Sequence, residues 1–114
     1  MKMYLAILFY FISASIFAAD YDKSYVGKYS WGPETHSFTV CNSKTTYWVS
    51  FDWAGVEMHE FYKKNQSKPY QFMYLRFRGH LLDEIVDGFA ADYDGLIRIS
   101  EIKEYSFVIP DSCK

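Results

Sequence analysis

The residues with the most clearly constrained chemistry in this chain are its two cysteines, Cys41 and Cys113. They form no Cys-x-x-Cys pair and lie far apart, so a metal-binding or nucleophilic cysteine pair is the less favoured interpretation. In an oxidising compartment, two such cysteines most simply bond to each other. We therefore expect one disulfide, worth roughly 4 kcal/mol in the chain-entropy treatment because it closes a long loop.

The stretch 70–78 has the composition of a binding surface. Side chains alternate between the two faces of a β-strand, and one face here is mostly apolar and suits a core: Gln71, Met73, Leu75 and Phe77. The other face carries rings and guanidinium groups: Tyr70, Phe72, Tyr74, Arg76 and Arg78. This set, the Tyr–Arg ladder, could stack on flat ligands or anchor a protein partner. The alternative is that a helix or loop covers the rings and the arginines pair with nearby acids.

Several acidic residues and histidines are candidate metal ligands. The segment 92–95 supplies two acidic ligands of a calcium loop but has its glycine at the wrong place, so a tight turn at Asp94-Gly95 is the better interpretation. His59-Glu60 lacks the second histidine of a zinc-protease helix, and no repeating Met or His pattern indicates copper. We expect no metal site and no cofactor, with a copper or zinc site as an alternative.

Charge and motif content disfavour two function classes. The formal net charge is −2 and no basic run exceeds Lys63-Lys64, whereas nucleic-acid binding depends on clustered Lys and Arg. A glycan ligand stays open. No Gly-x-Ser-x-Gly turn occurs, and Cys–His catalysis would need a reduced cysteine, so we expect no enzyme.

The first residues have the order of a secretory signal. Lys2 precedes an apolar run over residues 3–12, and small residues end at Ala18 and Ala19 before Asp20. The apolar run is shorter than the ~20 residues of a membrane span, although an uncleaved anchor is the competing interpretation. We expect a signal peptide over residues 1–19 and a single periplasmic or secreted domain over residues 20–114. A lipid anchor is not expected, because no cysteine lies near the cleavage point.

Most of the elements that would position these residues are strands. Aromatic residues make up 21% of the chain, and turn residues recur at short intervals, as in sheets with short connections. We expect strands over 26–30, 36–41, 45–51, 70–81, 85–91 and 96–109. One short helix is expected over 53–64, with Asp52 as its N-cap and a buried side formed by Ala54, Met58, Phe61 and Tyr62. Five or six strands on so short a chain favour a mainly β fold, a small closed or half-closed barrel.

Short motifs follow one another along the chain: Gly27-Lys28-Tyr29, Ser37-Phe38-Thr39-Val40-Cys41, Leu75-Arg76-Phe77-Arg78-Gly79 and Ile97-Arg98-Ile99. Their spacing resembles small OB-fold-like domains of bacterial envelope proteins, in particular the C-terminal domain of NlpE-type copper-homeostasis and envelope-stress lipoproteins. The resemblance implies an OB-like barrel, residence in the bacterial envelope, and binding rather than catalysis. This chain lacks the lipidated cysteine and the CxxC domain of those lipoproteins, so their copper chemistry and surface sensing are not carried over.

These observations predict a soluble periplasmic, non-catalytic binding or interaction module. It would bind another exported or envelope protein, in envelope homeostasis or as an inhibitor or immunity-type partner of that protein. The alternatives are a copper- or zinc-binding envelope protein and a glycan-binding OB-type domain. A rigid, disulfide-closed scaffold suits binding because little conformational entropy is lost on association.

Overall fold

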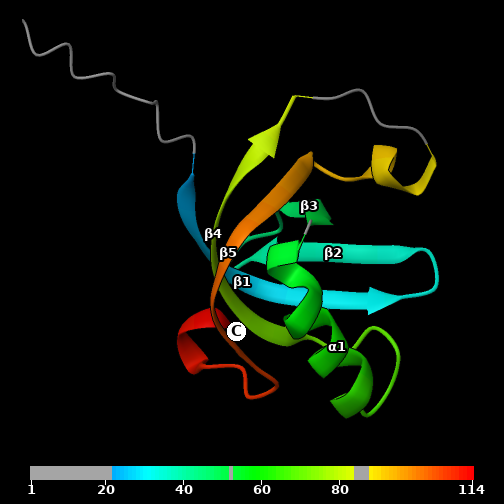
Figure 1. Ribbon diagram of the computed structural model, residues 1–114, viewed down its shortest axis with the longest axis vertical. Coiled ribbons are helices and arrows are strands. Elements are labelled where there is room, and N and C mark those ends of the chain that lie inside the picture. Colours follow the sequence, from blue (N-terminus) through cyan, green and yellow to red (C-terminus); the bar gives the residue numbers. More distant parts are fainter. Residues whose placement is uncertain (1–21, 52, 84–87) are drawn as a thin grey trace, which may run out of the picture.

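The computed structural model describes residues 22–51, 53–83 and 88–114 (Figure 1). The expected signal peptide over 1–19, the expected N-cap Asp52 and residues 85–87 of an expected strand lie outside these described residues. Among the described residues, no helix combines the length and apolar character that crossing a membrane requires.

Residues 22–51, 53–83 and 88–114 form five strands and one α-helix, which confirms the mainly β prediction. The strands are β1 (Lys23–Gly32), β2 (Thr35–Val40), β3 (Thr46–Phe51), β4 (Met73–Leu82) and β5 (Leu96–Ser106), and the helix is α1 (Val56–Asn65). Three short 3₁₀ turns accompany them: η1 (Trp53–Gly55), η2 (Gly88–Asp92) and η3 (Asp111–Cys113).

Several sequence-based boundaries are wrong. β1 spans Lys23–Gly32 instead of 26–30, and β5 ends at Ser106 instead of residue 109. The expected strand over 85–91 is a 3₁₀ turn from Gly88 onward. The α-helix starts at Val56 instead of residue 53, because Trp53–Gly55 forms a separate 3₁₀ turn and Gly55 is the N-cap, without a side-chain cap. The strand expected from Tyr70 begins only at Met73.

The five strands form one sheet that closes on itself in the order β1–β2–β3–β5–β4 (Figure 1). β1 is long enough to pair antiparallel with β2 along residues 27–32 and with β4 along residues 23–29. β3 and β5 pair in parallel, and the connection between them contains α1 and β4. A parallel pair needs such a long connection, since both strands must run in the same direction.

Two glycines allow neighbouring strands to approach closely where the sheet curves. Gly27 pairs with Val40 on one side and Leu75 on the other. A Cβ there would collide with the Thr39 carbonyl oxygen. Gly79 lies at a register shift between β4 and β5, where a Cβ would meet the Arg98 carbonyl oxygen. A side chain at either position would force the strands apart.

The core fills the inside of this closed sheet. Its buried residues come from all five strands and from α1: Tyr29, Phe38, Val49, Met58, Tyr62, Met73, Leu75, Phe77, Ile97 and Ile99. The buried side predicted for the helix is confirmed for Met58 and Tyr62. The Tyr62 hydroxyl donates to the Gln71 carbonyl at 2.7 Å and accepts from the Trp31 N–H at 3.2 Å, which fixes α1 against the end of β1 and the approach to β4.

The predicted disulfide between Cys41 and Cys113 is confirmed, across 72 positions of sequence. It joins the residue after β2 to η3. The Asn42 side-chain amide donates to the Ser112 carbonyl at 2.6 Å beside it. The last described residues are therefore held against the β2–β3 turn.

Candidate functional site

The alternation predicted for the Tyr–Arg ladder holds along β4. Met73, Leu75 and Phe77 are fully buried, whereas Arg76 is exposed and Tyr74 and Arg78 are half-buried on the outer face. Gln71 does not belong to the strand, and its side-chain oxygen accepts from the Ser67 N–H at 2.7 Å.

The ladder is not one continuous strand face, because Tyr70 and Phe72 precede β4. Tyr70 has a φ of 65°, and its backbone is held by the end of β1, since its N–H donates to the Trp31 carbonyl at 3.0 Å. Its hydroxyl donates to the Pro33 carbonyl at 2.8 Å. The Phe72 ring makes a different contact, with the Lys28 ammonium 4.8 Å from its centroid. Both rings remain about half exposed, at 47% and 46%.

The two arginines of the ladder are engaged with neighbouring strands, as the alternative interpretation proposed. Arg76 forms an ion pair with Glu104 of β5 at 3.4 Å. Arg78 donates to the Asp22 carbonyl at 3.2 Å, next to the start of β1. Neither is an isolated guanidinium, although both still lie on the outer face of β4.

A pocket that sequence reasoning missed lies between η1 and the paired strands β4 and β5. Its volume is about 330 Å³, and it is lined by Trp53, Ala54, His80, Arg98, Ile99 and Ser100. We call it the Trp53 pocket. Trp53 is 91% exposed, which is unusual for so large an apolar side chain. The pocket therefore combines an exposed indole with a guanidinium and an imidazole.

Asp22 orients the imidazole of this pocket. Its carboxylate accepts from His80 Nδ1 at 2.8 Å and from the Ser100 hydroxyl at 3.1 Å. The hydrogen bond from His80 is the main cause that holds the pKa of Asp22 below its usual value, with Ser100 and Arg78 adding to it. Because Ser100 donates to the carboxylate and not to His80, these three residues do not form the nucleophile–base contact of a hydrolase. They position His80 at the pocket wall.

A pair of histidines, His36 and His59, packs against the buried Tyr29. The Tyr29 hydroxyl and His59 Nδ1 share a hydrogen bond of 2.8 Å, and the ring of His36 lies 5.4 Å from that of Tyr29 and 5.7 Å from that of His59. Burial, with a smaller contribution from His59, lowers the pKa of His36 to about 4. Burial also lowers the pKa of His59 and raises that of Tyr29. All three rings are therefore neutral at pH 7.

The candidate metal ligands do not assemble into a centre in the described part of the chain. No three side chains of His, Cys, Asp or Glu gather there at metal-binding distance. Asp94, from the calcium-like segment, accepts from the Thr46 N–H at 2.8 Å and thereby fixes the start of β3.

Comparison with known proteins assigns no family: no protein-family model matches the chain, and neither a curated protein nor a solved structure matches it significantly. A function for this chain has to be argued from its own geometry.

Proposed function

We propose that this protein is an exported, non-catalytic binding module whose partner surface centres on the Trp53 pocket. The observation that carries the proposal is the 91% exposure of Trp53 beside Arg98 and the Asp22-held His80. Trp and Arg are the residues most enriched among those that dominate protein–protein binding energies. An indole that is exposed to water in the free protein contributes most to the binding free energy when a partner covers it, because its apolar surface is then removed from water.

The Tyr–Arg ladder would extend this surface along β4. His80, Arg78 and Arg76 alternate with buried residues, so they share the outer face of the strand. Arg98 pairs opposite His80 on β5 and continues the face. The partner would place an apolar hollow over Trp53 and acidic or carbonyl groups opposite the arginines.

The architecture supports an OB-like barrel as the scaffold. The closed order β1–β2–β3–β5–β4, the parallel pairing of β3 with β5, and the position of α1 between β3 and β4 are features of that topology. OB-folds serve mainly as binding domains. The disulfide supports an oxidising location such as the periplasm, and the resemblance to NlpE-type domains points the same way.

The test uses a partner identified by photo-crosslinking from position 54, which lines the same pocket, and then purified. Trp53→Ala should weaken its binding by about 2 kcal/mol or more, roughly 30-fold in Kd. Val108→Ala, which also truncates an exposed apolar side chain (76% exposed), is the matched control and should leave Kd unchanged. Circular dichroism would verify that both variants are folded.

Equal affinity of the wild type and Trp53→Ala would refute this binding site. If purified peptidoglycan or polysaccharide retains the wild type, and Trp53→Ala is not retained, the ligand class is glycan instead of protein.

A further inference from the structure

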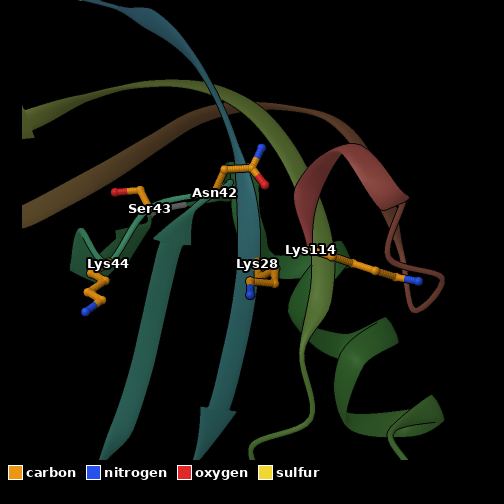
Figure 2. Close-up of a pocket in the computed structure, with 5 residues that line it drawn as sticks. All are labelled: Lys28, Asn42, Ser43, Lys44 and Lys114. Atoms are coloured by element: carbon orange, nitrogen blue, oxygen red, sulfur yellow. The ribbon is translucent and has the colours of Figure 1, made fainter.

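A second pocket, next to the disulfide, has a markedly basic lining. It is about 460 Å³ in volume and is lined by Lys28, Asn42, Ser43, Lys44 and Lys114 (Figure 2). We call it the lysine pocket. Of the five lining residues that the structure describes, three are cationic and none is acidic, although the whole chain carries a net charge of −2. Its volume falls in the range of small-molecule sites.

The disulfide assembles this pocket from segments that are far apart in sequence. Lys28 lies on β1, residues 42–44 form the β2–β3 turn, and Lys114 follows η3. Cys41 directly precedes the turn and Cys113 directly precedes Lys114, so the Cys41–Cys113 bond brings the two segments together. The cluster is therefore a product of the fold and not of a basic run.

Two of the three ammonium groups have no ion-pair partner among the described residues. Within the described residues, neither Lys28 nor Lys44 forms an ion pair, and the ammonium of Lys28 is positioned over the Phe72 ring at 4.8 Å. Lys114 pairs with Asp111 at 2.8 Å. An anion in the pocket would mainly neutralise Lys28 and Lys44.

The orientation of the side chains indicates the shape of the ligand. Figure 2 shows Lys28 at the centre, with the side chains of Lys44 and Lys114 on opposite sides of it. In this view the three ammonium groups are spread out and do not converge on one point. Such a spread suits an anion with several charged groups in series better than a single small ion.

We infer that the lysine pocket binds a small polyvalent oxyanion with two or three phosphate groups. The ligand could be free in solution or belong to clustered lipid headgroups, and the two sources share this chemistry. The described residues that line this site and those that line the Trp53 pocket are different. The two proposals can therefore fail separately.

Isothermal titration calorimetry of the oxidised protein with tripolyphosphate, at low ionic strength, tests the inference. Lys28→Gln/Lys44→Gln should weaken binding by about tenfold or more, because two favourable charge contacts are lost. The control is Lys63→Gln/Lys103→Gln, which removes the same charge from lysines paired with Glu60 and Glu101 elsewhere on the surface. This control and Trp53→Ala should both bind as the wild type does.

The inference would be overturned if the wild type bound neither tripolyphosphate nor phosphatidylglycerol vesicles. It would also be overturned if the control lost as much binding as Lys28→Gln/Lys44→Gln, since that would mean a response to net charge alone. A parallel co-sedimentation with phosphatidylglycerol vesicles, against phosphatidylcholine vesicles, separates the two sources. Loss of vesicle binding in Lys28→Gln/Lys44→Gln would assign the pocket to headgroups. Binding of tripolyphosphate alone would assign it to a free anion.

Discussion

Mild acid should destabilise this fold through His36. The side chain is packed against the rings of Tyr29 and His59, and burial lowers its pKa from the ordinary 6.5 to about 4. A proton therefore binds His36 more tightly in the unfolded chain than in the folded one. The stabilising effect of keeping His36 neutral is complete above pH 6.5 and is lost as the pH falls toward 4.

The size of the effect follows from the two pKa values. Their difference corresponds to roughly 3 kcal/mol once the pH is below both. At about pH 5 the unfolded chain is mostly protonated at His36 while the folded protein is not, so about 2 kcal/mol is already lost relative to pH 7.5. The pKa of His59 is lowered in the same direction, mainly by burial, and adds to the loss.

Urea unfolding at several pH values between about 7.5 and 5 measures this loss, with His36→Gln as the comparison. The variant can be more or less stable than the wild type, but its stability should fall less steeply with acid. Equal pH dependence in the two proteins would refute the reasoning. An NMR titration that gave a pKa near 6.5 for His36 in the folded protein would refute it independently.

Two further substitutions test the packing. Tyr62→Phe should lower the free energy of unfolding by about 1–3 kcal/mol, because it leaves the Gln71 carbonyl without its donor. The control is Tyr105→Phe, whose hydroxyl has no hydrogen bond within the described residues. An equal loss of stability in this control would contradict the prediction. Gly79→Ala should lower stability by about 1–3 kcal/mol, since its Cβ would meet the Arg98 carbonyl oxygen. Gly95→Ala, where the nearest atom is 3.4 Å away, should be nearly neutral; thermal melting that shows similar midpoints for the two alanine variants would rule out the close approach.

The order of side chains along the sequence was enough to predict several parts of the fold. Alternation along Met73 to Phe77, the buried side of α1 at Met58 and Tyr62, and the single disulfide were all predictable from the sequence. Tyr70 was mispredicted because its positive φ depends on hydrogen bonds to β1, about forty positions earlier in the chain, which no local pattern contains.

Neither pocket could be predicted from the sequence in this way. The sequence pattern places Trp53 at the start of a helix, and the residue type alone does not indicate that this tryptophan is exposed. The sheet register alone brings Asp22 to His80. The lysine pocket had one usable signal: once Cys41 and Cys113 are expected to bond, the residues that follow each of them, Lys44 and Lys114 included, must lie near one another.

The parallel pairing of β3 with β5 sets an order on folding. β3 can pair with β2 as soon as both strands exist. Its other edge pairs with β5, which begins at Leu96, and α1 and β4 lie between β3 and β5 in the sequence. Ring closure is thus a long-range event, which slows folding because the loop entropy is lost before the contact forms. Until then β3 presents an unpaired edge to neighbouring chains. A newly made chain should therefore be most prone to edge-to-edge association, and to capture by a chaperone, before β5 docks.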